Sequence, residues 1–247
     1  MIRRRALLAL PLLAVVPAQA AVPAAAQPIS RLDTPWWRAR HEAKLAELKR
    51  VQPGLIWLGD SITENFERDG PEPWARYQPV WQRYYAPDRA VNLGFKGDAT
   101  SHLLWRITHG ELDGIAPSAA VVLIGANNLG RLHWSAADTI AGIETLIHET
   151  RRRLPTTRIL LLSVLPSDRT PWASETTLTI NQGLAQRFAN VTGVTYQDVT
   201  SLFVRNGSLD HSLFYDPLLT PPEPALHPTA AGMAKLAAAI QPQLAKL

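Results

Sequence analysis

The feature that most constrains the fold is a repeated alternation of short apolar runs with longer helical segments. The apolar runs predict strands, and they occupy residues 55–58, 90–94, 119–124, 158–165 and 194–199. The segments between and around them predict helices, at 36–51, 62–68, 100–108, 136–153, 176–190 and 229–245. Strands that alternate with helices in this way predict right-handed βαβ units and a parallel sheet covered on both faces. The fold class is therefore α/β.

The first twenty residues have the three parts of a secretory signal peptide. Residues 1–5 carry three arginines, Ala6 to Val16 is apolar, and Ala18-Gln19-Ala20 is a small-x-small cleavage site. We therefore expect the mature chain to begin at Ala21, with residues 24–26 as a second potential cleavage site, and the protein to be periplasmic or secreted.

The rest of the chain is expected to be an Ala/Pro-rich tether at 21–35 followed by a single domain at 36–247. The formal net charge is +4, but without the three arginines of the signal peptide 22 basic residues face 21 acidic ones. No basic stripe remains to indicate a nucleic-acid partner. No second apolar run is long enough to predict membrane insertion after signal removal. The sequence has no cysteine and no metal-ligand motif, so we expect no metal and no cofactor.

Ser61 follows the first predicted strand within Gly59-Asp60-Ser61, where a helix could begin. A serine at such a strand-to-helix turn is exposed at the carboxyl end of the sheet. It also lies near helix N–H groups that favour negative charge. These properties suit a nucleophile. The alternative is that Ser61 only caps the helix, since serine is a preferred N-cap.

Four polar or glycine positions should meet at that same edge of the sheet. Ser61, Gly94 and Asn127 each follow a predicted strand, and His227 precedes the last helix. Ligands of open parallel sheets bind at the carboxyl ends of the strands. Acyl transfer needs a nucleophile, a base and oxyanion donors, which Ser61, His227 and the Ser61 N–H, Gly94 N–H and Asn127 amide can supply. Turn formation is the alternative explanation for Gly94 and Asn127.

These segments resemble the SGNH (GDSL-type) hydrolases, nearest to the platelet-activating-factor acetylhydrolase-like branch. Four blocks carry the resemblance: residues 59–61, 92–100, 124–128 and 226–232. The resemblance implies a three-layer α/β/α sandwich, flavodoxin-like, with a five-stranded parallel sheet in the order 2-1-3-4-5. It also implies Ser61 as nucleophile, Gly94 and Asn127 in the oxyanion hole, and His227 as base.

The expected catalytic acid is missing from its usual position. The family pattern has aspartate three residues before the histidine, but here that position is Pro224. Four explanations remain open: Glu223 substitutes for the aspartate, the Pro224 carbonyl orients His227 in a dyad, Asp210 or Asp216 reaches in from the 204–226 loop, or activity has been lost. The acid matters because its loss in serine proteases lowers kcat roughly 10⁴-fold.

Export, the resemblance and the aromatic content suggest a substrate class. Trp134 and Trp172 follow the third and fourth strands, where a flat aromatic could bind a sugar ring. We therefore expect an exported serine esterase that removes short acyl groups, such as acetyl, from a carbohydrate or another small ester. The alternatives are a polysaccharide O-acyltransferase of the same fold and a catalytically weak carbohydrate-binding accessory protein of a polysaccharide-synthesis complex.

Overall fold

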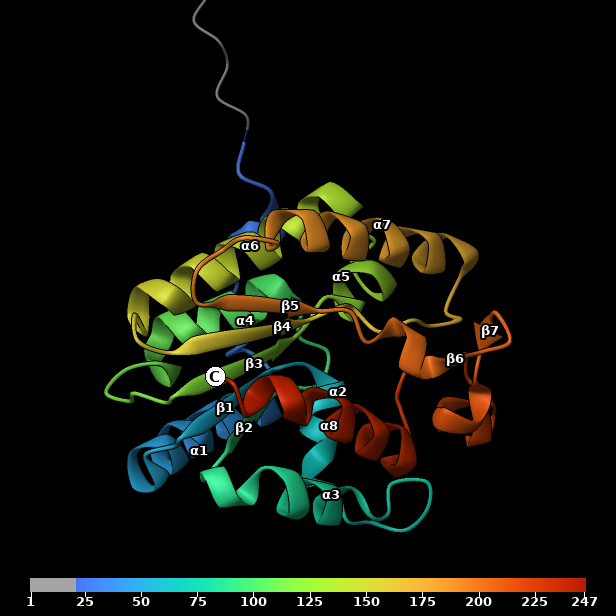
Figure 1. The fold of residues 1–247 in the computed structure, drawn as a ribbon, viewed down its shortest axis with the longest axis horizontal. Coiled ribbons are helices and arrows are strands. Elements are labelled where there is room, and N and C mark those ends of the chain that lie inside the picture. The colour runs from blue at the N-terminus through green and yellow to red at the C-terminus, as the bar shows by residue number, and fades with distance from the viewer. Residues whose placement is uncertain (1–20) are drawn as a thin grey trace, which may run out of the picture.

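The computed structural model describes residues 21–247, so the predicted signal peptide lies outside the described residues. Five parallel strands form one sheet in the order β2-β1-β3-β4-β5. They are β1 (Leu55–Gly59), β2 (Val91–Gly94), β3 (Ala119–Leu123), β4 (Arg158–Leu162) and β5 (Val194–Gln197). The predicted sheet and its strand order are confirmed (Figure 1).

Helices cover both faces of this sheet, which gives the predicted three-layer sandwich (Figure 1). One face packs against α4 (Thr100–Arg106), α6 (Ala136–Arg153) and α7 (Pro171–Arg187), and the other against α3 (Tyr77–Tyr84) and α8 (Ala230–Leu244). Helix α1 (Pro35–Val51) lies at the β2 edge, while the short α2 (Ser61–Glu64) and α5 (Ala126–Gly130) follow β1 and β3.

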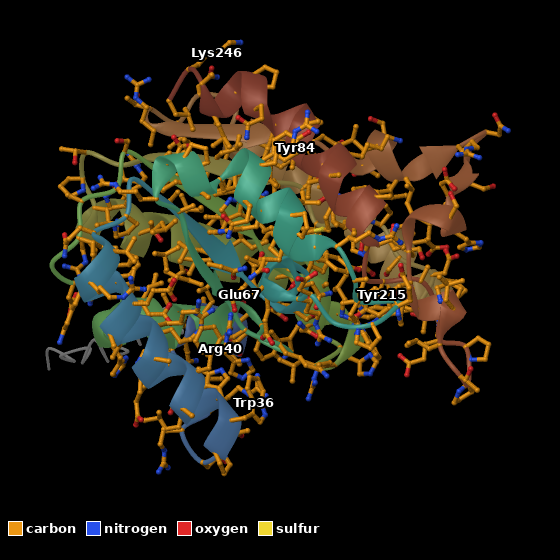
Figure 2. The ribbon with its side chains drawn as sticks, turned by 90° about the horizontal axis from the view of Figure 1, so that it is seen from below. Trp36, Arg40, Glu67, Tyr84, Tyr215 and Lys246 are labelled. Atoms are coloured by element: carbon orange, nitrogen blue, oxygen red, sulfur yellow. The ribbon has the colours of Figure 1, made fainter. Side chains whose placement is uncertain are left out.

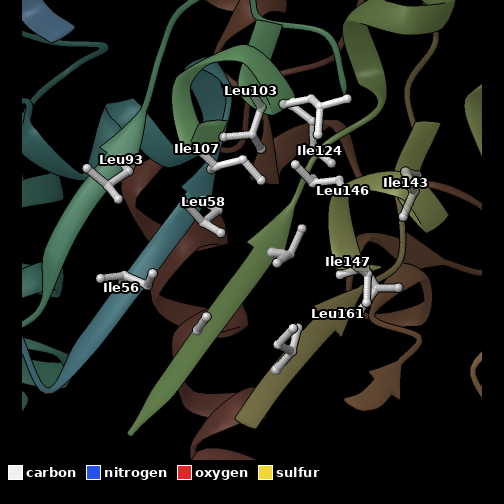
Figure 3. Close-up of a cluster of buried hydrophobic side chains, with 14 of the residues drawn as sticks. Ile56, Leu58, Leu93, Leu103, Ile107, Ile124, Ile143, Leu146, Ile147 and Leu161 are labelled. Carbon is white, nitrogen blue, oxygen red and sulfur yellow. The ribbon is translucent and has the colours of Figure 1, made fainter. Parts of the chain in front are cut away.

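Alternate side chains of each strand fill the two halves of the core. Figure 3 shows one half, a cluster that includes Ile56 and Leu58 of β1, Leu103 of α4 and Leu146 of α6. Trp57 and Leu55 point to the opposite face, into the cluster formed with α3 and α8. Because both faces are buried, the strands are apolar throughout, and this is why short apolar runs could be recognised as strands in the sequence.

Two helix boundaries differ from the prediction for local reasons. Helix α7 begins at Pro171, five residues earlier than expected, because the Thr170 hydroxyl caps it by accepting a hydrogen bond from the Ala173 N–H at 3.0 Å. Proline at the first helical position is favourable there. The helix predicted for 62–68 is α2 followed by a 3₁₀ turn at Asn65–Glu67.

Residues 21–35, for which the composition predicts a tether, pack against the domain. Ala25 and Ala26 are buried in a 3₁₀ turn, and the Thr100 hydroxyl donates to the Ala25 carbonyl at 2.8 Å. This carbonyl lies so close to α6 that a Cβ on Gly142 would be 2.5 Å from it. Small side chains on both surfaces make the close approach possible, so the alanine-rich composition serves packing here and does not indicate a loose linker.

The 204–226 segment is ordered by short elements. It contains the two-stranded ribbon β6 (Val204–Arg205) and β7 (Ser208–Leu209), and 3₁₀ turns at His211–Leu213 and Asp216–Leu218. An isolated bridge between Phe214 and Pro228 brings it back to the start of α8. Among residues 21–247, none of the helices has both the length and the apolar character needed to cross a membrane.

Candidate active site

Ser61 occupies the first helical position of α2, directly after β1. The helix is capped by Asp60, whose Oδ1 accepts a hydrogen bond from the Ile62 N–H at 2.9 Å. Asp60 is therefore the cap, and the alternative interpretation of Ser61 as the N-cap is wrong. The Ser61 hydroxyl faces a histidine, with Oγ 3.0 Å from Nε2 of His227. The N–H at this helical position has no partner within the helix, so it is available to a ligand.

The carboxylate that holds His227 belongs to Asp216. Its Oδ1 lies 2.6 Å from His227 Nδ1, and its Oδ2 accepts the backbone N–H groups of His227 and Leu226 at 2.6 and 2.8 Å. In the neutral imidazole, an Nδ1–H that donates to this carboxylate makes Nε2 the acceptor that faces the serine. These three contacts fix the ring, its tautomer and the backbone that carries it.

Glu223, the first of the four explanations left open by the sequence, does not hold the imidazole. Its backbone N–H donates to the Asp216 carbonyl at 3.0 Å, and its side chain lines the cavity beside the serine. Asp210, another of the open alternatives, pairs instead with Arg205 at 2.8 Å and caps the turn at Ser212. The tentative assignment of Glu223 is therefore corrected to Asp216, which the sequence left open as a residue that reaches in from the 204–226 loop. The 3₁₀ turn at Asp216–Leu218 brings its carboxylate against the imidazole.

Asp216 remains charged although it is buried. Burial alone raises its pKa, but the hydrogen bond and the positive charge that His227 can acquire, together with the two backbone N–H donors, outweigh burial and lower the pKa below 3.8. A carboxylate that is ionised at neutral pH can stabilise an imidazolium. The structure therefore contains a hydrogen-bonded Ser61–His227–Asp216 chain.

Asn127 lies on the other side of Ser61, at the start of α5. It is buried, and its Nδ2 donates to the Asp98 carbonyl at 3.0 Å and lies 3.4 Å from Asp60 Oδ2. These contacts hold the amide between Asp60 and the loop after β2, at the carboxyl edge of the sheet where Ser61 lies. The role of a neutral oxyanion donor stays a prediction for Asn127.

Gly94 does not have the role that the sequence suggested. Its N–H donates to Oδ1 of Asn92 at 2.8 Å, so it is already engaged. A Cβ at Gly94 would lie 2.2 Å from the Glu64 nitrogen, which shows that glycine is required here for the close approach of α2 to β2. The correction is that Gly94 is a packing residue.

Gly97, three residues later in the same loop, differs from Gly94 in its hydrogen bonding. It has a φ of +78°, a conformation that favours glycine, and it precedes Asp98, whose carbonyl holds Asn127. Within residues 21–247, its N–H donates no hydrogen bond to the chain. The sequence signal was present, because Gly97 belongs to the same block as Gly94, but the hydrogen-bond partners in three dimensions were needed to choose between them.

A cavity of about 420 Å³ opens over the serine. Its aromatic walls are Trp74 and Tyr215, and the Tyr215 ring stacks on that of His227 with centroids 5.3 Å apart (Figure 2 labels Tyr215). Trp172 instead lines a separate pocket with His133, and Trp134 lines neither. The expectation that Trp134 and Trp172 border the site is therefore corrected: the aromatic residues at this cavity are Trp74, from the turn before α3, and Tyr215, from the 204–226 segment.

Asp60 is the second buried carboxyl beside the serine. Burial raises its pKa from the ordinary 3.8 to about 6, against the lowering effects of the Ile62 N–H and of His227. It faces Asn127 at 3.4 Å, and Asp98 adds a further raising contribution. The two carboxyl groups on either side of Ser61 thus have pKa values moved in opposite directions.

The fold and the matching sequence define a carboxylic-ester hydrolase. Residues 57–235 match the GDSL-like lipase/acylhydrolase family, and the chain belongs to that family. It is 30% identical over 220 residues to platelet-activating factor acetylhydrolase IB subunit alpha2 of Homo sapiens and of Rattus norvegicus, with 88% of this chain and 86% of the relative covered.

Solved structures share the same fold. A GDSL-like lipase from Bacteroides thetaiotaomicron superposes with a TM-score of 0.65 at 18% identity, covering 84% of this chain and 97% of that one. A catalytic mutant of an acetylxylan esterase from Geobacillus stearothermophilus superposes with a TM-score of 0.57 at 20% identity, covering 78% and 94%. At these identities the likeness concerns the architecture of the chain.

Proposed function

We propose that this protein is an exported serine esterase that removes short acyl groups, acetyl above all, from a carbohydrate or another small ester. The observation that carries the proposal is the hydrogen-bonded chain from Ser61 Oγ through His227 to Asp216, at 3.0 and 2.6 Å. It opens onto a cavity of about 420 Å³ that can hold a small ester.

The catalytic cycle follows from these positions. Ser61 Oγ attacks the acyl carbonyl while His227 Nε2 takes its proton, and Asp216 stabilises the imidazolium. The Ser61 N–H, the Gly97 N–H and the Asn127 amide donate to the developing oxyanion. Collapse breaks the ester C–O bond, and His227 returns the proton to the leaving alcohol. Water, activated by His227, then releases the acyl group from Ser61 as the free acid.

Two observations support the substrate class. Relatives at 30% identity are named acetylhydrolases, and a fold neighbour is named an acetylxylan esterase. The cavity is lined by Trp74, Tyr215, Arg68 and Glu223 among others, and combines flat aromatic faces with charged groups. Aromatic faces with hydrogen-bonding neighbours suit a sugar ring, and the small cavity suits a short acyl group.

The Asp216 contact bears on one of the two alternative functions. A catalytically weak binding protein was suggested by Pro224 in the acid position, but Asp216 supplies a carboxylate to His227. No contact in the described part of the chain favours an acyltransferase over a hydrolase.

Export rests on the sequence of residues 1–20, which has the composition of a signal peptide. The packing of the following segment supports cleavage at Ala20. Cleavage after Ala26 would remove Ala25, whose carbonyl accepts a hydrogen bond from Thr100.

The test is hydrolysis of p-nitrophenyl acetate, butyrate and octanoate by the chain from Ala21, beside Ser61→Ala. We expect acetate to be the preferred substrate and Ser61→Ala to lose about 10⁴-fold or more in kcat, as serine hydrolases do without their nucleophile. Equal rates in the two proteins would refute the serine mechanism. Preference for octanoate would refute the short-acyl assignment and leave the mechanism intact.

A further inference from the structure

We propose that Arg31, from the segment before α1, is a positioning residue for the oxyanion hole. This inference rests on the proposed function, and specifically on Gly97 and Asn127 as oxyanion donors. It makes the segment that follows the predicted signal peptide part of the catalytic apparatus, although Arg31 lies 30 residues before Ser61 in the chain.

Arg31 holds the chain on both sides of Gly97. Its guanidinium Nη1 donates to the Lys96 carbonyl at 3.0 Å and to Asp98 Oδ1 at 2.8 Å. The Lys96 N–H is held from the other side by Oε2 of Glu64 at 2.5 Å. Gly97 therefore sits between two anchored residues, and the orientation of its N–H depends on them.

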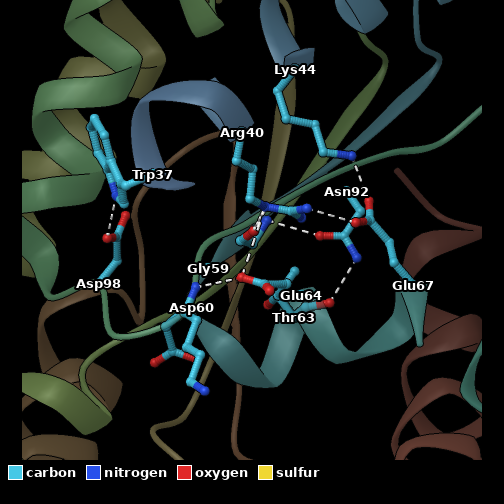
Figure 4. Close-up of polar contacts among 12 residues, drawn as sticks. Trp37, Arg40, Lys44, Gly59, Asp60, Thr63, Glu64, Glu67, Asn92 and Asp98 are labelled. Atoms are coloured by element: carbon cyan, nitrogen blue, oxygen red, sulfur yellow. Dashed lines mark hydrogen bonds and ion pairs between the residues drawn. The ribbon is translucent and has the colours of Figure 1, made fainter. Parts of the chain in front are cut away.

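Asp98 links this loop to Asn127 and to the core. Its side chain is fully buried and accepts hydrogen bonds from Arg31, from Nε1 of Trp37 and from Nε of Arg106, each at 2.8 Å. Figure 4 shows Trp37 directed at the Asp98 carboxylate. Since the Asp98 carbonyl accepts from Asn127 Nδ2, the same residue fixes both proposed donors.

Arg106 extends the cluster to the nucleophile strand. It is fully buried, pairs with Glu111 at 2.5 Å, and donates to the Gly59 carbonyl at 3.2 Å, two residues before Ser61. Buried ion pairs are weak evidence for stability, because desolvation offsets much of their attraction. A cluster that joins the end of β1 to the loop after β2 is better explained by the geometry it imposes on the site between them.

Arg31 is the member of this cluster that can be removed with least disturbance. The exposed fraction of the Arg31 side chain is 17%, whereas the side chains of Asp98 and Arg106 are fully buried. Without Arg31, Trp37 and Arg106 still hold the Asp98 carboxylate, but the Lys96 carbonyl loses its partner on one side of Gly97. The loosened N–H should then stabilise the oxyanion less while substrate binding is little changed.

The experiment compares Arg31→Gln with Arg38→Gln and Arg31→Lys in the chain from Ala21. Arg38 is the matched control, because its Nε donates to the Leu32 carbonyl at 2.8 Å, which holds the same segment without contacting the 94–98 loop. Both glutamine variants remove one positive charge. Removal of a direct oxyanion donor costs roughly 10²–10³-fold in kcat, so loss of a positioning contact should cost about 10-fold.

The expected result for Arg31→Gln is a kcat lowered about 10-fold with KM unchanged. Its affinity for a trifluoromethyl ketone, which forms a tetrahedral adduct with serine, should fall by the same factor. Arg38→Gln should match the wild type, and Arg31→Lys should recover part of kcat. The melting temperature identifies any variant whose fold is disturbed, and the ketone affinity is then compared at a temperature where all are folded.

Three results would overturn the inference. If Arg31→Gln and Arg38→Gln have equal kcat while Ser61→Ala is inactive, Arg31 has no positioning role and the proposed function stands. If Arg31→Gln changes KM alone with ketone affinity unchanged, the residue acts on substrate binding. Equal turnover by Ser61→Ala and the wild type would refute the serine mechanism and the inference with it.

Discussion

The two sides of Ser61 are built by different means. On the imidazole side, one carboxylate does most of the polar positioning, because Asp216 accepts hydrogen bonds from the His227 ring and from the backbone beneath it. On the oxyanion side, a buried cluster of several residues does the positioning. Asp98 is held there by three side chains, and its own carbonyl holds Asn127.

This difference has a consequence for how each side tolerates change. A single carboxylate has no substitute, so its removal should abolish most of the function of that side. A shared network should lose function in smaller steps, since each hydrogen bond that is removed leaves others in place. The two buried carboxyl groups near the serine also differ in their pKa values. Hydrogen bonds and the charge of His227 lower the pKa of Asp216, whereas burial raises that of Asp60.

The largest effect is expected for Asp216→Asn. The amide keeps the size of the side chain but can no longer stabilise the correct tautomer and the charged form of His227, so kcat should fall about 10⁴-fold. Steady-state kinetics on p-nitrophenyl acetate would measure this. Glu223→Gln is the control, since Glu223 lines the cavity without holding the imidazole, and its kcat should stay near wild type. The reverse ranking would restore Glu223 as the acid.

A smaller effect is expected for Asn127→Ala. Loss of this side-chain donor should lower kcat about 10²–10³-fold with little change in KM, because the donor acts mainly on the transition state. The Ser61 and Gly97 N–H groups would remain. Asn128→Ala is the neighbouring control, since Asn128 Nδ2 donates to the Thr100 hydroxyl at 2.8 Å and does not contact Asp98. A fall in kcat as large as that of Asp216→Asn would argue against a shared network.

The smallest effect concerns pH and Asp60. The folded protein holds a proton on Asp60 up to about pH 6, whereas the unfolded chain releases it near 3.8, so this group lowers stability as pH rises between these values. Asp60→Asn removes this dependence of stability on pH, because the amide does not titrate. The free energy of unfolding of the variant minus that of the wild type should therefore increase by about 2 to 3 kcal/mol from pH 4 to pH 7.

Urea unfolding at a series of pH values would measure this slope. Asp216 provides the opposite sign, because its lowered pKa gives stability above pH 3.8 that is lost as pH falls through the folded pKa. Parallel pH profiles of wild type and Asp60→Asn would contradict the raised pKa of Asp60.

The sequence by itself determined the architecture of the sheet and which residues lie at the edge where the site is found. Continuous apolar runs are required of strands buried on both faces, so the five strands could be identified, and the parallel sheet then placed Ser61, Asn127 and His227 at one edge. These features can be predicted because strands are visible as local patterns, and because the carboxyl ends of parallel strands lie at the same edge of a sheet.

The tertiary structure alone decided what the loops contribute. Asp216 lies eleven residues before His227, and only the folded path of the 204–226 segment brings its carboxylate to the ring. Gly94 and Gly97 could not be distinguished until the fold showed that, within residues 21–247, the Gly94 N–H donates to Asn92 and the Gly97 N–H donates to no group of the chain. Arg31 lies in a segment whose composition resembles a tether. The physical reason is the same in each case: loop side chains act through long-range contacts, which no local sequence pattern specifies.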